Sequence, residues 1–196
     1  MNGVGDAPDY LQLTLSRFLD LVASEDPVPA GGSVVAVAIA LAAGLSVMTC
    51  RLSTKHIADA SKLAERADSL RGAAAPLAQA DAVAYGRVLA AQDRGLRDAL
   101  SQAADVPLAE AEAGAEVAEI SARLARDGNP NLRGDVVAAA LLAEAGVRAA
   151  TWLAKVNLSI GGIEDRRLAH ADALLEAAAS ARRTAEGGSQ GEPERS

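Results

Sequence analysis

The most suggestive chemistry in this chain lies where a loop meets an apolar segment. Gly31, Gly32 and Ser33 follow a proline-containing loop and directly precede a long run of Ala, Val, Leu and Ile. The first turn of a helix carries unpaired N–H groups and a partial positive charge, which attract a carboxylate or a phosphate. Glycine also lets a ligand approach the backbone closely. The pattern suggests an anion site at a helix start; the alternative is an ordinary loop with Ser33 as the N-cap residue.

A second candidate is Asp81, a charged residue between Ala80 and Ala82. If this segment is helical, Tyr85 follows one turn later on the same face. A carboxylate among alanines on a packed helix is expected to have a raised pKa and to take part in proton transfer. The alternative is a solvated aspartate on a surface face, because most acidic residues of proteins are exposed.

The composition restricts the partners and the cofactors. A net charge of −7 and only four aromatic residues argue against nucleic acid, because the surface repels phosphates and offers no stacking platform. One cysteine, Cys50, and two histidines are too few for a zinc site, and we predict no metal, with carboxylate-bound magnesium left open. The single cysteine fits a reducing compartment, and the first residues lack the pattern of a signal peptide. We therefore expect a cytoplasmic protein.

Helical periodicity runs through nearly the whole chain. It predicts helices over residues 10–26, 33–53, 54–92 with a kink or break at Pro76, 107–126 with Pro107 in the first turn, 132–158 and 163–186. Asp9 is the expected cap of the first helix, and 92–105 is expected to be a connection, with a short helix of its own as an alternative. The fold class is therefore all-α, a bundle of about five to seven helices with a buried Ala-rich central helix. We expect one helical domain over 1–186 and a disordered polar tail over 187–196.

The segment from Pro27 to Cys50 has no charged residue and is long enough to be a membrane span. Three observations favour a buried core helix instead. Many of its residues are alanine, no other segment looks apolar enough to span, and the other helices have apolar faces that need a partner. We therefore expect no membrane partner.

Four blocks of sequence resemble one known family when they are taken in order. They are "FLDLVASEDPVPAGGSVVAVAIALAAGLSVM" from Phe18, "ADAVAYGRV" from Ala80, "ADVPLAEAE" from Ala104, and "DGNPNLRGDVVAAALLAEAGVRAA" with "KVNL" from Asp127. Together they resemble the formiminotetrahydrofolate cyclodeaminase and methenyltetrahydrofolate cyclohydrolase family over about residues 11 to 180. The resemblance implies either of two reactions. One converts 5-formiminotetrahydrofolate to 5,10-methenyltetrahydrofolate with release of ammonia, and the other hydrolyses 5,10-methenyltetrahydrofolate to 10-formyltetrahydrofolate.

The resemblance also assigns roles to residues, with the folate as substrate and no separate cofactor. It implies Asp81 as the catalytic carboxylate, because a carboxylate can stabilise the cationic one-carbon unit and transfer a proton. The implied substrate-binding residues are Gly31, Gly32, Ser33, Arg51, Lys55, Tyr85, Asn129, Asn131, Asp135, Lys155 and Asn157. For Lys155 and Asn157 a ligand role follows from the resemblance alone.

Several of these residues also have structural explanations. Asn129 and Asn131 could read a pterin edge, but asparagine is also a common turn and cap residue. Arg51 and Lys55 could hold the glutamate tail, but cations also suit a helix C-terminus. Asp135 falls in the first turn of its helix, where a carboxylate interacts favourably with the helix dipole.

The chain departs from the family pattern at four places. Ala30 stands where a glycine is usual, Gly134 replaces a serine, Leu153 aligns with an asparagine, and the connection 92–105 is short. These departures leave two alternatives open: a relative repurposed for another substrate, and a non-catalytic helical interaction module. The excess of Ala-rich helical surface, with the resemblance, predicts a homodimer or a higher homo-oligomer.

Overall fold

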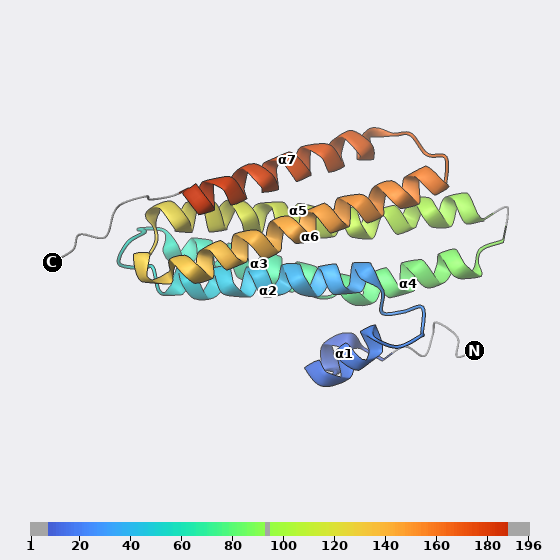
Figure 1. The fold of residues 1–196 in the computed structure, drawn as a ribbon, viewed down its shortest axis with the longest axis horizontal. Helices are drawn as coiled ribbons and strands as arrows, with labels where there is room; N and C mark the ends of the chain where they lie inside the picture. The colour runs from blue at the N-terminus through green and yellow to red at the C-terminus, as the bar shows by residue number, and fades with distance from the viewer. Residues whose placement is uncertain (1–7, 93–94, 188–196) are drawn as a thin grey trace.

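The computed structural model describes residues 8–92 and 95–187, which form a bundle of long helices with no strand among them (Figure 1). The helices are α1 (Leu15–Val22), α2 (Gly31–Arg51), α3 (Ala60–Ala74), α4 (Leu77–Ala90), α5 (Leu96–Asp127), α6 (Arg133–Ile160) and α7 (Arg166–Gly187). Short 3₁₀ turns at Tyr10–Gln12 and Pro130–Leu132 precede α1 and α6. The predicted all-α bundle of five to seven helices is confirmed.

Helix α2 is the central helix, and it packs against α3, α4, α5 and α6. Its Ile39 is fully buried. Two glycines allow neighbouring helices to approach this side chain. A Cβ on Gly114 of α5 would lie 3.2 Å from an Ile39 carbon, and a Cβ on Gly146 of α6 would lie 2.6 Å from one. Close packing of small residues around Ile39 therefore makes α2 the buried Ala-rich helix that the sequence predicts.

Helices α2 and α6 are both long and apolar enough to cross a membrane, judged by length and composition alone. The expectation that no segment besides α2 is apolar enough is therefore wrong, since Pro130–Ile160 has a mean hydropathy of 1.5 over its most apolar window. Within the fold, 56% of the corresponding window of α2 and 44% of that of α6 are buried. Core helices of a bundle show this pattern, and the absence of a membrane partner stays a prediction.

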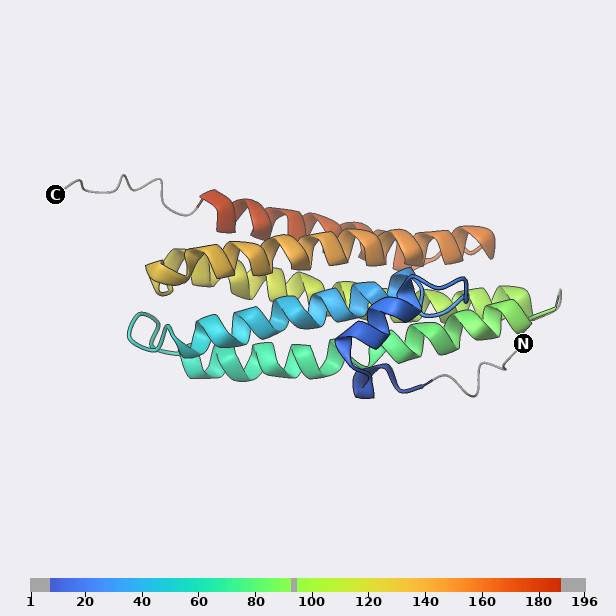
Figure 2. The same cartoon turned by 60° about the horizontal axis from the view of Figure 1, so that its bottom comes forward.

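The N-terminal segment lies across α2 and α4 on one side of the bundle (Figure 2). A single helix over 10–26 is a wrong prediction, because Asp9 caps only the 3₁₀ turn and Thr14 caps α1 separately. The break lets two aromatic rings, Tyr10 and Phe18, meet edge to face with centroids 5.8 Å apart. They form one buried cluster with alanines of α2 and α4, namely Ala36, Ala78 and Ala82.

The predicted segment 54–92 is divided near Pro76 into α3 and α4, as expected. Its beginning differs, because residues 52–59 form turns before α3 starts at Ala60. The backbone carbonyl of the buried Ser53 accepts hydrogen bonds from the N–H groups of His56 and Ile57. Burial of Ser53 and Ile57 therefore holds a compact turn where the sequence pattern suggested a helix.

Helix α5 is longer than predicted. It begins at Leu96, so most of the expected connection 92–105 is helical, and Pro107 lies buried in its interior instead of in the first turn. A proline inside a helix removes one N–H donor and disturbs the preceding turn. Packing of α5 against α2, α4, α6 and α7 holds the helix continuous despite this cost.

The last two helices follow the prediction closely. Helix α6 begins at Arg133, and α7 begins at Arg166, later than expected, because Gly162 turns the chain with a φ of 59°. Asp165 then accepts a hydrogen bond from the N–H of Arg167 in the first turn of α7. Helix α7 includes Gly187, and the rest of the predicted tail lies outside the described residues.

Candidate active site

The Asp81 carboxylate of α4 lies against the first turn of α2. Its Oδ2 accepts a hydrogen bond from the backbone N–H of Ser33 at 2.9 Å, and it is 3.2 Å from the Ser33 hydroxyl. An anion is thus held at the glycine-containing helix start, as the sequence pattern suggests, but the anion is a side chain of the protein itself. The N-terminal partial positive charge of α2 favours the ionised form of this carboxylate.

Gly32 provides the space for the carboxylate. A Cβ at this position would lie 2.1 Å from Oδ1 of Asp81, closer than two non-bonded atoms can approach. The neighbouring Gly31 is different, because its Cβ would meet only Leu153 Cδ1, at 4.0 Å. Of the two glycines, only Gly32 is therefore required for the position of Asp81.

Ser33 is not the N-cap residue of α2. The helix begins at Gly31, and the N-cap is Ala30, which has no side-chain hydrogen bond to offer. The fully buried Ser33 hydroxyl instead donates to the backbone oxygen of Ala78 at 2.7 Å. Asp81, from another helix, satisfies the Ser33 N–H that an ordinary cap would satisfy.

The surroundings of Asp81 raise its pKa. Partial burial of the carboxyl group is the main cause, and the hydrogen bonds from Ser33 oppose it. The negative charge also acts on Tyr10, whose phenol has a pKa raised first by burial and then by Asp81. The backbone N–H of Tyr10 donates to Gln79 Oε1 at 3.2 Å, which fixes the N-terminal segment beside α4. The sequence analysis did not select Tyr10, because its 3₁₀ turn is distant from Asp81 along the chain.

Glu110 of α5 is a second carboxyl group that the sequence analysis did not select. It is fully buried, and neither of its carboxyl oxygens has a hydrogen-bond partner among the described residues. Burial, together with the nearby negative charge of Asp81, raises the pKa of Glu110 to about 9. Glu110 therefore carries a proton at neutral pH. In the sequence it resembles Glu112, which is exposed, and only the packing of α5 separates the two.

A second group of predicted site residues lies at the opposite end of α2. Arg51 ends this helix and Lys55 follows it, and both are exposed. A helix of 21 residues is about 30 Å long at 1.5 Å per residue, so these cations lie far from Asp81 within one chain. The two predicted groups of residues thus do not converge on one cleft of a single chain.

Asn129, Asn131 and Asp135 belong to this same distant end. The Asn129 side chain accepts from the Asn131 N–H at 3.1 Å and donates to the backbone oxygen of Leu52 at 3.3 Å. Asp135 lies in the first turn of α6. The asparagines therefore hold the turn between α5 and α6 against the end of α2, and their role in binding stays a prediction.

Lys155 and Asn157, near the end of α6, already have partners within the chain. Lys155 forms an ion pair with Asp172, and the Asn157 side-chain amide donates to the backbone oxygen of Ala103 at 3.0 Å. Tyr85 is exposed on α4, one turn after Asp81, and no hydrogen bond joins the two in the described part of the chain.

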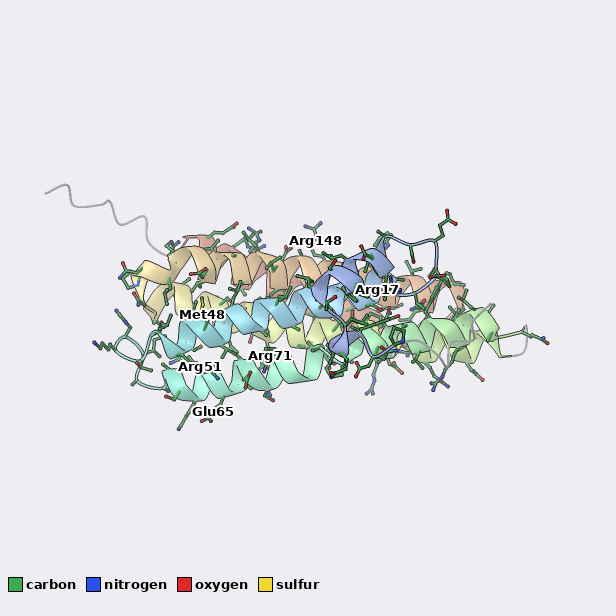
Figure 3. The ribbon with its side chains drawn as sticks, turned by 90° about the horizontal axis from the view of Figure 1, so that it is seen from below. Arg17, Met48, Arg51, Glu65, Arg71 and Arg148 are labelled. Atoms are coloured by element: carbon green, nitrogen blue, oxygen red, sulfur yellow. The ribbon has the colours of Figure 1, made fainter. Side chains whose placement is uncertain are left out.

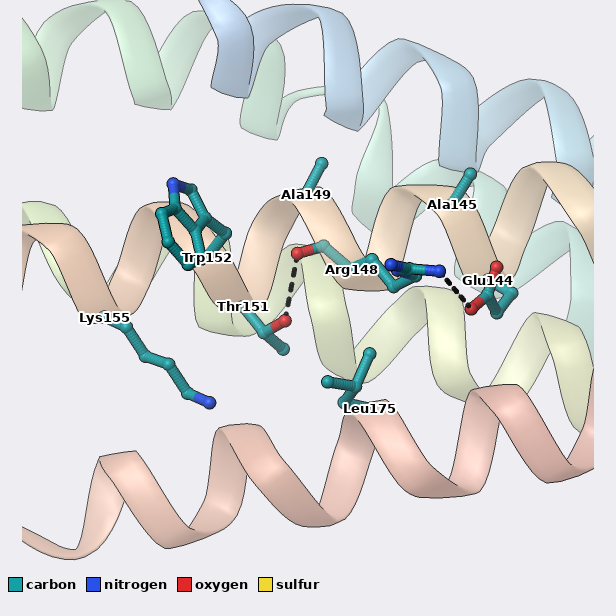
Figure 4. A pocket seen from close by; sticks show the side chains of 8 residues that line it. All are labelled: Glu144, Ala145, Arg148, Ala149, Thr151, Trp152, Lys155 and Leu175. Carbon is teal, nitrogen blue, oxygen red and sulfur yellow. Dashed lines mark hydrogen bonds and ion pairs between the residues drawn. The ribbon is translucent and has the colours of Figure 1, made fainter.

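A pocket of about 530 Å³ lies between α6 and α7 (Figure 4). Trp152, Lys155 and Arg148 contribute to its lining, and Trp152 is 69% exposed. Asp81 does not line this pocket. Within residues 8–92 and 95–187, no three His, Cys, Asp or Glu side chains come together as metal ligands, and the prediction of a metal-free site remains a prediction.

Two departures from the family pattern can be placed. Leu153 faces the start of α2, where it adds apolar surface beside Gly31. Gly134 lies in the first turn of α6, and a Cβ there would meet nothing within 4 Å. The serine usual at this position would therefore fit without rearrangement.

The fold and the site together define an all-α protein that holds a carboxylate at the start of its central helix. A family described as formiminotransferase-cyclodeaminase matches residues 14–178. A methenyltetrahydrofolate cyclohydrolase of Methylorubrum extorquens is 32% identical over 175 residues, which cover 80% of this chain and 83% of the relative. The crystal structure of formiminotetrahydrofolate cyclodeaminase from Thermotoga maritima has a TM-score of 0.80 at 27% identity and covers 90% of this chain and 98% of that one. This chain belongs to the formiminotransferase-cyclodeaminase family, whose named relatives here are enzymes of folate one-carbon metabolism.

Proposed function

We propose that this protein hydrolyses 5,10-methenyltetrahydrofolate to 10-formyltetrahydrofolate. The observation that carries the proposal is the Asp81 carboxylate, held at the start of α2 by Ser33 and given space by Gly32. The curated relative with 32% identity is named as a cyclohydrolase, which favours hydrolysis over the other reactions of this family.

The chemistry of the substrate suits this carboxylate. The methenyl carbon bridges N5 and N10 of the folate and is cationic, so a nearby negative charge stabilises it. Attack by water on this carbon requires a base, and a carboxylate with a raised pKa is a better base at neutral pH than an ordinary aspartate. Asp81 takes a proton from the attacking water as its oxygen bonds to the methenyl carbon, which gives a tetrahedral adduct. Asp81 then returns this proton to N5 as the C–N5 bond breaks. The hydroxyl group of the adduct loses its proton to solvent as the C=O bond forms, and the one-carbon unit stays on N10 as a formyl group.

Cyclodeamination is a second candidate. In that reaction N10 attacks the formimino carbon, ammonia leaves, and the same methenyl compound is the product. The Thermotoga maritima structure, which is named for this reaction, is covered over 98% of its length by this chain. The same Asp81 would serve both reactions, because both place positive charge on the one-carbon unit.

One assay separates these candidates. The purified protein is mixed with 5,10-methenyltetrahydrofolate, and the absorbance of the methenyl compound is followed with and without the protein. A parallel sample with 5-formiminotetrahydrofolate is tested for ammonia. Faster loss of the methenyl absorbance supports hydrolysis, and ammonia release with a gain in that absorbance supports cyclodeamination. If neither rate exceeds the protein-free rate, the chain is a repurposed relative or a non-catalytic helical module.

We also propose that the protein acts as a homodimer or a higher homo-oligomer. On α2, Val34, Leu41 and Met48 are exposed apolar residues spaced by seven positions, so they share one face of the helix. Figure 3 shows Met48 on the face of the bundle seen from below, together with Arg148 of α6. Exposed apolar surface of this kind favours association with another copy of the chain.

The relative direction of the two α2 helices in such a contact decides which residues come together at the site. An isologous contact along α2 with the two helices antiparallel would bring the Arg51 end of one copy to the Asp81 end of the other. The cations and the asparagines that lie far from Asp81 within one chain would then lie near it in the assembly. We further propose a cytoplasmic location and a folate substrate with no separate cofactor.

A further inference from the structure

Glu110 is the largest unexplained polar feature in the described interior. The side chain has no exposed surface, and both of its oxygens lack a hydrogen-bond partner among residues 8–92 and 95–187. An unpaired buried polar group costs about 1–3 kcal/mol, so its presence calls for an explanation. Packing alone does not supply one, since an apolar side chain of the same length would fill the same space.

The face of α5 that carries Glu110 runs towards Asp81. Val106, one turn before Glu110, lines a groove with the α4 residues Ala80, Val83 and Ala84. Gly114, one turn after Glu110, faces Ile39 of α2. Glu110 therefore lies where α5 passes from α4 to α2, which is also where Asp81 of α4 meets the start of α2.

The two carboxyl groups have unequal surroundings. Asp81 accepts hydrogen bonds from Ser33 at a helix N-terminus, and it is partly exposed. Glu110 has no donor among the described residues and no exposed surface. Two buried carboxyl groups near one another cannot both ionise easily, so the charge goes to the group with the donors.

The other charged groups in the described part of the chain do not balance a negative charge on Glu110. Helix α2 has no charged side chain before Arg51, and on α4 the ionisable residues after Asp81 are Tyr85 and Arg87, both exposed. Basic side chains of the helices packed against α5 pair with other acids: Arg66 with Glu116, Arg148 with Glu144, Lys155 with Asp172, and Arg167 with Asp105. The ring of His170 contacts Glu112. After burial, the negative charge of Asp81 is the second cause that raises the pKa of Glu110.

We propose that Glu110 and Asp81 work as a carboxyl pair, in which Glu110 keeps a proton and Asp81 keeps the negative charge. Glu110 is thus a positioning residue that acts through Asp81. Its neutral side chain occupies the interior where α5 passes from α4 to α2 and leaves the negative charge on Asp81. A second negative charge at Glu110 would repel Asp81 from the start of α2 and draw water into the interior. The activity part of this inference rests on the proposed function, whereas the pairing of the two groups does not.

The pairing is tested without any enzyme assay, by the infrared absorption of the protonated carboxyl group. At pH 7 the wild-type protein should show this band, and Glu110→Gln should lack it. The exposed Glu112→Gln is the matched control on the same helix and should keep the band. In wild type the band should disappear with a midpoint near pH 9, the pKa of Glu110. In Asp81→Asn the midpoint should move to lower pH, because the charge that opposes ionisation of Glu110 is gone.

The positioning role is tested by the rate at pH 7. Glu110→Ala removes the buried side chain and should lower kcat, whereas Glu110→Gln, which keeps a neutral side chain of the same shape, should restore most of that loss, with Glu110→Met in its place if Glu110→Gln does not fold. A kcat of Glu110→Ala equal to that of wild type would overturn the positioning role. Absence of the band in wild type, or a midpoint unchanged by Asp81→Asn, would overturn the pair. A kcat of Glu110→Gln as low as that of Asp81→Asn would overturn the positioning role. An inactive wild type that still shows the shifted midpoint would refute the proposed function alone.

Discussion

The predicted site residues at the two ends of α2 have very different surroundings. At its first turn, a buried serine and a glycine hold the carboxylate of Asp81 from another helix. At its other end, Arg51 of the last turn and Lys55 beyond it are exposed, and Asn129 stabilises the turn that precedes α6. A polar side chain that a fold buries with fixed partners is preorganised for chemistry, whereas an exposed one keeps its freedom until a ligand or a partner arrives. This difference is the reason why we propose the chemistry at the first end and, at most, recognition at the second.

The largest expected loss of activity comes from a change to Asp81, at the start of α2. Asp81→Asn keeps the shape of the side chain but removes its charge and its proton-accepting group. Because a positioned acid–base group contributes about a hundred- to ten-thousand-fold, kcat for the methenyl compound should fall by at least that order. The melting temperature should stay close to that of wild type. Asp68→Asn, which removes an exposed carboxylate paired with Arg71, is the control and should leave the rate unchanged. Equal rates for the two variants would contradict the role of Asp81.

The two adjacent glycines give the next effect. Gly32→Ala places a methyl group 2.1 Å from Oδ1 of Asp81 and must displace the carboxylate. A displacement of about 1 Å can cost about a hundredfold in rate, so kcat/KM should fall by that order. Gly31→Ala meets only Leu153 and should retain most of the activity. Steady-state kinetics of the two variants test this contrast, which fails if both alanines are tolerated equally.

If the protein is an oligomer that pairs along the exposed face of α2 with the two helices antiparallel, the Asp81 end of one copy lies near the Arg51 end of another. Leu41 is 61% exposed on this face, and Leu41→Lys should dissociate the assembly because a charge in an apolar interface is costly. Light scattering at micromolar concentration should show the mass of a single chain. Leu89→Lys alters a similarly exposed leucine on α4 and should leave the mass of wild type. A wild-type protein that is already monomeric would refute the proposed assembly.

Stability should fall as the pH rises from about 5 to about 9. Glu110 has a folded-state pKa of about 9 and an ordinary value of 4.5, so the folded protein binds more protons than the unfolded chain between these values. Its contribution to stability is therefore complete below the ordinary pKa and is lost as the pH approaches the folded-state pKa. Melting temperatures measured across this range should fall for wild type and for Glu112→Gln. The slope should be smaller for Glu110→Gln, and an identical slope would contradict the buried neutral acid.

The smallest expected effect on stability comes from Gly134, near the Arg51 end of α2. Unlike Gly32, this glycine has free space where a side chain would lie. Gly134→Ala adds a methyl group to the first turn of α6 where nothing lies within 4 Å. Alanine is more favourable than glycine in a helix by about 0.5–1 kcal/mol, so the free energy of unfolding should rise by about that amount. Urea unfolding monitored by circular dichroism measures it, and a loss of stability would show that this end is packed more tightly than its geometry indicates.

Local patterns predicted the helical fold, but they placed the start of α2 at Ser33 instead of Gly31. The glycine pair, the apolar run after it and the isolated Asp81 each have a local signature, because helix starts and helix faces are set by neighbouring residues. The same reasoning failed for Pro107. Local rules place a proline at a helix start, but tertiary packing holds Pro107 in the interior of α5. It also missed Glu110, because nothing nearby in the sequence distinguishes it from the exposed Glu112.

The sequence also did not reveal the distance between the two ends of α2. Arg51 and Gly31 belong to one helix, and the family resemblance groups them in one site without saying that a helix length separates them within a chain. Only the direction of α2 and the contact between Asn129 and Leu52 reveal the separation. Residues that share a motif can therefore reach one ligand through a second copy of the chain, which no local pattern encodes.

We propose that the start of α2 acts in catalysis through the Asp81 carboxylate. The double variant Gly32→Ala with Asp81→Asn tests it most directly, when kcat/KM for the methenyl compound is measured for wild type, both single variants and the double variant. If Gly32 matters only because it gives space to Asp81, the double variant should be within about twofold of Asp81→Asn, since the two losses are not additive. If the losses multiply, Gly32 and Asp81 act independently, and the account of the site is wrong.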